Sequence, residues 1–249
     1  MASQGRYYHA RAGKLDQSLD YAAQARETGE VLNDTRLRAW CAMEAESYLY
    51  QGKWDEVVRV VEGALPIAGE IREWNIVIHS SAWLAIAYLK LRLPADARQA
   101  LERGLKGLPA RSVGQYAYSI AFAQIALAQS HLAAGDTGEA LIAAHRALGA
   151  SEKGRFGLEE GAAHRVLGQI HEALDARAEA DAAFRRSLEV LDEIQSQPEL
   201  AQTLLAYGRF RRGDNTVENR ALIERALHLF EEMNATGWIE EARAALAAA

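Results

Sequence analysis

The chain of 249 residues contains a single cysteine, Cys41, and only four prolines. One cysteine excludes an intrachain disulfide and a cysteine-rich metal site. The prolines, at positions 66, 94, 109 and 198, leave long stretches in which helices can form. Alanine occurs 49 times, which favours closely packed helices over a β-sandwich. Because 49% of the residues are hydrophobic, the chain can bury a large core, and we expect an all-α protein.

Long apolar runs and an excess of positive charge are also missing. No window approaches 18 uninterrupted apolar residues and the first residues lack the apolar core of a signal peptide, so we expect neither a membrane span nor secretion, and a cytoplasmic location. The net charge of −6 gives no basic stripe along which a nucleic acid could bind. Residues 5–13 read like the end of a repeat already under way, so we expect a segment of a longer protein.

A small residue recurs about every forty positions along the chain. The first series runs Ala45, Ala85, Ala128, Gly168 and Gly208, with steps of 40, 43, 40 and 40 residues. A second series, Ser18, Val57, Ala97, Ala140, Ala180 and Ala221, advances by 39, 40, 43, 40 and 41. Because two independent registers agree, we predict an internal repeat of helical hairpins.

The two registers divide the chain into about six hairpins within one continuous solenoid, residues 1–249. We place them at approximately 1–33, 34–71, 72–111, 112–154, 155–195 and 196–234. Since stacked repeats leave an apolar face open at the end of the array, we expect a final helix, residues 236–247, to cap it with Glu240, Glu241 and Arg243 on its outer side.

Three helix starts carry the pattern of an N-terminal cap. Ser112-x-x-Gln115 and Ser196-x-x-Glu199 have the spacing of a capping box, and Asp136 lies three residues before Glu139. We therefore expect these side chains to accept hydrogen bonds from the first backbone N–H groups of their helices.

Two segments carry a recognisable helix-turn-helix signature. They are Leu167-Gly168-x-x-His171…Ala180-x-x-x-Phe184 and Leu84-Ala85-x-x-Tyr88…Ala97-x-x-x-Leu101. The pattern resembles that of tetratricopeptide-repeat (TPR) proteins, in particular the roughly forty-residue repeats near the C-terminus of bacterial signalling proteins that carry a STAND-type or AAA-type ATPase with a cyclase, kinase or transcription-regulator domain. The resemblance implies a right-handed superhelical solenoid. It also implies a non-catalytic sensor or scaffold for a protein, a peptide or a small effector.

In such a solenoid the first helix of each hairpin lines the concave face. The residues one position after the small residue are Glu46, Ile86, Gln129, Gln169 and Arg209, which pass from acidic to basic. We predict a groove that binds a partner protein or peptide, with aromatic anchors at one end and arginines for an acidic group at the other. Its candidate residues are Trp83, Phe122, Gln129, Arg165, Gln169, Glu172, Arg209 and Arg212. The lysines and asparagines of a TPR carboxylate clamp are absent from these positions.

A second hypothesis is a solenoid that senses a small effector and regulates an attached ATPase, cyclase or transcription-regulator domain. A pocket closed by the first and last turns of the array favours this hypothesis, whereas an open groove favours a peptide.

Catalytic, metal and cofactor sites are not indicated. His164 and His171 lie seven residues apart, whereas two ligands on one helix usually lie three or four apart. Cys41 has no histidine nearby in the sequence, and no glycine-rich phosphate-binding loop is present. We therefore expect no catalytic residue, no metal and no cofactor.

Overall fold

The computed structural model describes residues 8–106, 114, 116–212 and 216–248, and all regular secondary structure within them is helical. Residues 8–11 form a helical turn. The helices that follow are α2 (Leu15–Val31), α3 (Thr35–Trp40), the 3-10 helix η1 (Cys41–Glu44), α4 (Ala45–Gln51), α5 (Trp54–Glu70), α6 (Trp74–Lys90), α7 (Pro94–Lys106), α8 (Ala117–Ala133), α9 (Thr137–Gly154), α10 (Gly157–Ala173), α11 (Arg177–Glu193), α12 (Gln197–Phe210), α13 (Thr216–Glu232) and α14 (Thr236–Ala247). The prediction of an all-α chain is confirmed for the part that the structure describes.

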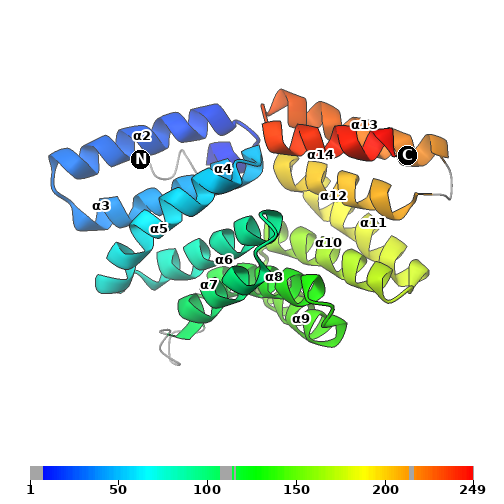
Figure 1. Cartoon of the computed structure of the whole chain (residues 1–249), viewed down its shortest axis with the longest axis horizontal. Helices are drawn as coiled ribbons and strands as arrows, with labels where there is room; N and C mark the ends of the chain where they lie inside the picture. Colours follow the sequence, from blue (N-terminus) through cyan, green and yellow to red (C-terminus); the bar gives the residue numbers. More distant parts are fainter. Residues whose placement is uncertain (1–7, 107–113, 115, 213–215, 249) are drawn as a thin grey trace.

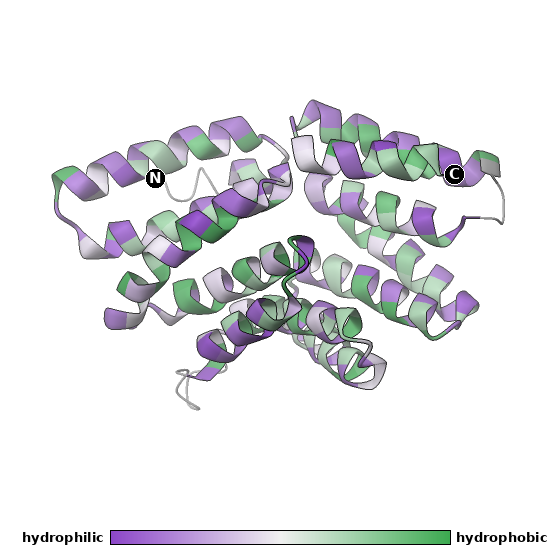
Figure 2. Ribbon diagram, in the orientation of Figure 1, coloured by the Kyte–Doolittle hydropathy of each residue, from purple (hydrophilic) through white to green (hydrophobic). Residues whose placement is uncertain are grey.

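Successive helices form antiparallel pairs with an inner and an outer member, and the pairs follow one another along an arc (Figure 1). The inner helix α10 buries ten of its 17 residues, whereas its outer partner α11 buries five of 17. Figure 2 shows the same contrast in hydropathy, because the outer helix α7 carries mainly hydrophilic residues and the inner helix α6 mainly apolar ones. The inner helices are covered on two sides, by their partners and by the next pair, and therefore carry more apolar residues.

The recurring small residue is a packing position. Ala45, Ala85 and Ala128 are fully buried. A Cβ atom added at Gly168 would come within 2.9 Å of the Phe184 ring, so only glycine lets α10 and α11 approach this closely. Phe184 in turn stacks on Tyr207 of α12, with 5.4 Å between ring centroids. The forty-residue period therefore records where each inner helix meets its partner.

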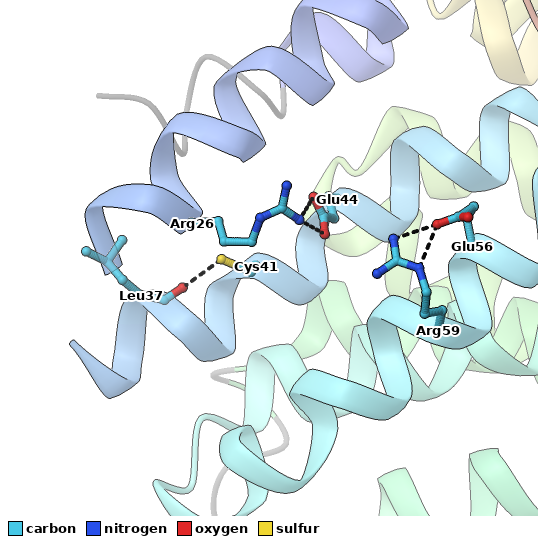
Figure 3. A network of polar contacts seen from close by, with 6 residues as sticks. All are labelled: Arg26, Leu37, Cys41, Glu44, Glu56 and Arg59. Atoms are coloured by element: carbon cyan, nitrogen blue, oxygen red, sulfur yellow. Dashed lines mark hydrogen bonds and ion pairs between the residues drawn. The ribbon is translucent and has the colours of Figure 1, made fainter. Parts of the chain in front are cut away.

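The first half of the second hairpin, predicted at residues 34–71, is not a single helix. It consists of α3, the 3-10 turn η1 and α4. At the break the Cys41 thiol donates to the backbone oxygen of Leu37 at 3.4 Å, and Arg26 of α2 donates to the buried Glu44 carboxylate at 3.0 Å (Figure 3). The 3-10 turn thus lies where an ion pair joins α2 to this segment.

Two of the predicted cap residues take the N-cap position without the expected side-chain hydrogen bond, and the third lies outside the described residues. Ser196 and Asp136 occupy N-cap positions, but neither side chain bonds to a backbone N–H of its helix. Glu199 instead accepts a hydrogen bond from Arg165 of α10. Ser112 and Gln115 belong to the residues that are not described. The Glu199 carboxylate therefore forms an ion pair with Arg165 of another helix and not the predicted capping hydrogen bond.

The two ends of the array meet, which the expected capping helix did not anticipate. Trp238 of α14 donates its indole N–H to the backbone oxygen of Leu49 in α4 at 3.1 Å. Gly237 packs against the backbone of Gly52, and the Asn234 side chain donates to Asp16 at 3.2 Å. Figure 1 shows the start of α14 beside the end of α4. We call these contacts the end-to-end junction.

Lys90 of α6 strengthens the junction from the inside. Its ammonium lies 2.6 Å from Glu241 and 3.9 Å from the centre of the Trp238 ring. Glu241 also pairs with Arg209 at 3.3 Å. The residue expected on the outer side of a cap therefore joins α14 to α6 and α12.

Candidate functional site

A central cavity of about 720 Å³ lies where most of the array converges. Its walls come from residues 8–12, from α3 with η1, from α6, from α8, from the start of α10 and from residues 194–196. Positions almost 190 residues apart in sequence thus share one cavity. Such convergence requires the curvature of the array and is typical of ligand sites between helices.

Aromatic side chains form much of the cavity wall. Tyr8, Trp40, His79 and Tyr118 line it. The His79 ring is itself surrounded by rings, with centroids 5.2 Å from Tyr118, 5.4 Å from Trp83 and 5.7 Å from Phe122. Flat apolar walls of this kind suit a flat apolar group.

His79 is held in one neutral form. Burial lowers its pKa to about 4, although a backbone hydrogen bond opposes this shift. Nδ1 lies 3.0 Å from the backbone oxygen of Asn75. Since a carbonyl oxygen only accepts, Nδ1 carries the proton, and Nε2 is left as an acceptor.

A buried layer of charge adjoins the cavity. Arg11, which lines it, lies 3.5 Å from Glu46 and 3.6 Å from Glu159, and donates to the Tyr118 hydroxyl. Glu159 is fully buried, and neither of its carboxylate oxygens has a hydrogen-bond partner among the described residues. Burial raises the pKa of Glu159 to about 8, with Arg11 acting in the opposite direction. The layer therefore places the Arg11 guanidinium between the carboxyl groups of Glu46 and Glu159.

The structure does not bring the eight predicted groove residues into one site. Trp83 and Phe122 lie in the core behind His79, and Trp83 is only 1% exposed. Neither side chain lines the cavity. Trp83 therefore supports the cavity wall and does not form an open anchor.

The arginines expected to bind an acidic group are already engaged or lie elsewhere. Arg165 is buried and pairs with Glu199. Arg209 pairs with Glu241 in the end-to-end junction, and Arg212 is exposed after the end of α12. The acidic partners of Arg165 and Arg209 lie on other helices, 34 and 32 positions further along the chain, so the repeat pattern of the sequence could not reveal them.

Three of the predicted residues do share a pocket. Gln129, Gln169 and Glu172 line a second depression of about 570 Å³ together with Ile86 and Lys90. Burial raises the pKa of Glu172. This pocket and the central cavity have no lining residue in common, and none of the eight predicted residues lines the central cavity.

The central cavity is lined by residues that the sequence analysis did not predict as binding residues. Asn75 and His79 are one turn apart on α6, and Ser196 and Arg11 lie at helix ends. The predicted groove residues lie near or after the small residue of each inner helix and include none from the first two turns of α6, where Asn75 and His79 lie. A useful signal would have been the pair Asn75 and His79, two polar residues on one face of an apolar helix.

The described residues contain no cluster of metal ligands and no membrane-spanning helix. There, no three histidine, cysteine, aspartate or glutamate side chains gather as metal ligands would. The described helices include none with the length and apolarity needed to cross a membrane. Cys41 is half-buried with its thiol bonded to Leu37 (Figure 3).

Comparison with known proteins identifies the fold. No family model and no curated protein matches the sequence. The structure is similar to that of Rap protein complexed with Competence and Sporulation Factor, with 16% identity and a TM-score of 0.69 over 97% of this chain and 73% of that one. A weaker likeness, with 12% identity and a TM-score of 0.37 over 98% of this chain and 95% of that one, is to the TPR2AB-domain:pHSP90 complex of yeast Sti1. The chain is a TPR-like α-solenoid, as the repeat pattern predicted.

Proposed function

We propose that this TPR-like solenoid is a non-catalytic interaction module that binds a peptide or a short segment of a partner protein on its inner surface. The observation that carries the proposal is the central cavity, whose walls come from six parts of the array. A volume of about 720 Å³ is within the range of ligand sites. It admits a few side chains of a partner but not a folded domain. The similar Rap protein structure was likewise obtained as a complex with a second component.

A test needs a variant that fills the cavity and a matched one that does not. Ala12 lines the cavity in a turn followed by Gly13, which has positive φ. Ala134 occupies the same place before Gly135, also with positive φ, but it is exposed and lines no described pocket. Peptides selected from a display library on the unaltered chain are expected to bind Ala134→Trp and to lose binding to Ala12→Trp. Equal binding to both variants would place the partner elsewhere.

The end-to-end junction favours the second hypothesis, a small effector held inside the array. Because the ends meet, a ligand in the interior can contact the first and last hairpins at once. A thermal-shift screen against small metabolites addresses this, since a specific ligand raises the melting temperature by mass action. A ligand that stabilises the chain and Ala134→Trp but not Ala12→Trp supports a small effector, and a complete screen without such a ligand favours the peptide.

A place in a larger cytoplasmic signalling protein of bacteria is proposed from the sequence resemblance. The natural gene sequence on either side of this chain tests it: an adjoining ATPase, cyclase, kinase or transcription-regulator domain is expected, and flanking sequence without one contradicts it.

A further inference from the structure

Two polar atoms without partners lie in the side chains that line the central cavity. His79 Nε2 and Ser196 Oγ are both buried and have no hydrogen-bond partner among the described residues. Each residue is 3% exposed. A buried polar group that forms no hydrogen bond destabilises a fold, so two in one cavity require an explanation. A bound ligand that supplies the missing bonds is such an explanation.

The chemistry of His79 specifies what that ligand must offer. Because Nδ1–H donates to Asn75, the Nε2 atom can only accept. The ligand group opposite must therefore be a donor. Arg11 lines the same cavity and carries a positive charge, which disfavours an ammonium or guanidinium donor there. An uncharged N–H or O–H group satisfies both conditions.

The remaining walls specify the shape of the ligand. Tyr8, Trp40, Tyr118 and His79 line the cavity with aromatic rings. Aromatic rings pack favourably against one another in edge-to-face or offset arrangements. The Ser196 hydroxyl can bond to a polar group elsewhere on the same ligand, because a hydroxyl both donates and accepts.

We propose that the central cavity binds an uncharged aromatic ring that carries one N–H or O–H donor, such as an indole or a phenol, with that donor bonded to His79 Nε2. The inference rests on the proposed function and names the chemistry of the anchoring group. The ring has two possible sources, the side chain of a tryptophan or tyrosine in a partner peptide, or a free small molecule.

The test compares indole with 1-methylindole, which has the same ring without the donor. Isothermal titration of the unaltered chain is expected to give a dissociation constant roughly three- to tenfold lower for indole, as one neutral hydrogen bond provides. In His79→Phe the ring packing with Trp83, Tyr118 and Phe122 is kept and the acceptor is removed, so the two compounds should bind equally. His145→Phe, on the exposed side of α9, is the matched control and should keep the preference.

The possible results distinguish a failure of this inference from a failure of the proposed function. Equal affinities in the unaltered chain, a preference that survives in His79→Phe, or no binding of either compound would each overturn the inference. Binding without preference that is lost in Ala12→Trp would overturn it and leave the proposed function standing. Selected peptides that still bind Ala12→Trp would instead remove the proposed function.

A blocked tripeptide with a central tryptophan, compared with its 1-methyltryptophan form, distinguishes the two sources. Tighter binding of the tripeptide than of indole, with the same preference, assigns the ring to a peptide. Binding of indole alone assigns it to a small molecule.

Discussion

Replacing Gly237 by alanine is expected to disturb the end-to-end junction. Gly237 is the second residue of α14 and faces the turn at Gly52. A Cβ atom built there would lie 2.4 Å from the backbone oxygen of Gly52 and 2.9 Å from its carbonyl carbon. Backbone atoms cannot rotate away as a long side chain can, so α14 must move relative to α4.

The magnitude follows from two opposing effects. Overpacking of this kind destabilises by about 1–3 kcal/mol. Exchanging glycine for alanine within a helix stabilises by roughly 0.5–1 kcal/mol. The balance predicts that Gly237→Ala lowers the free energy of unfolding by about 1–2 kcal/mol. Gly138 is also the second residue of its helix, α9, and a Cβ atom there meets nothing within 4 Å, so Gly138→Ala should be neutral or slightly stabilising.

Urea unfolding of both variants measures the difference. Hydrogen exchange of the Trp238 indole N–H, which donates to Leu49 across the junction, reports the local effect and should accelerate in Gly237→Ala only. If the two variants are equally stable and the Trp238 N–H exchanges at an unchanged rate, the ends of the array do not meet in solution as described.

Three further predictions concern the interior. Burial lowers the pKa of His79 from 6.5 to about 4, so between these pH values the unfolded chain binds a proton that the folded chain does not. The free energy of unfolding should therefore fall by at most roughly 3 kcal/mol as the pH drops through that window. His79→Phe should remove this pH dependence in urea titrations, and an unchanged dependence would assign it to another group. Burial raises the pKa of Glu159 from 4.5 to about 8, so its contribution to the free energy of unfolding is present below pH 4.5 and is lost as the pH rises towards 8. Glu159→Gln should therefore lose less stability between pH 5 and 8 than the unaltered chain. An equal loss in both proteins would contradict the raised pKa of the buried carboxyl. Gly168→Ala should lower the melting temperature because its Cβ atom would meet the Phe184 ring at 2.9 Å, whereas Gly149→Ala, with open space around it on α9, should not; equal melting temperatures would show that α10 and α11 separate easily.

The repeat pattern could be predicted from the sequence because its cause is local. A small residue is needed wherever an inner helix crosses its partner, and Gly168 with Phe184 shows this contact directly.

The hydrogen bonds at helix starts were harder to predict. Glu199 has the spacing of a capping residue, yet it pairs with Arg165, 34 positions earlier. A tertiary partner in the interior competes with the local bond, and the sequence alone does not show which one forms.

The site depended even more on long-range placement. The predicted groove residues are divided between the core, the junction and a second pocket, as Trp83, Arg209 and Gln129 illustrate. The ladder assumes an open arc in which equivalent positions line one groove. The actual curvature brings α14 against α4 and turns the first residues of the inner helices towards a common centre.

The sequence by itself determined the helical class and the forty-residue repeat of this protein, because both arise from contacts within a hairpin. Only the tertiary structure decided that the array closes on itself, that His79 and Ser196 share a cavity with Arg11, and that the interior charges pair with one another. Small rotations between successive hairpins accumulate over the whole chain. The accumulated rotation decides which distant residues meet, and it cannot be read from any short stretch of sequence.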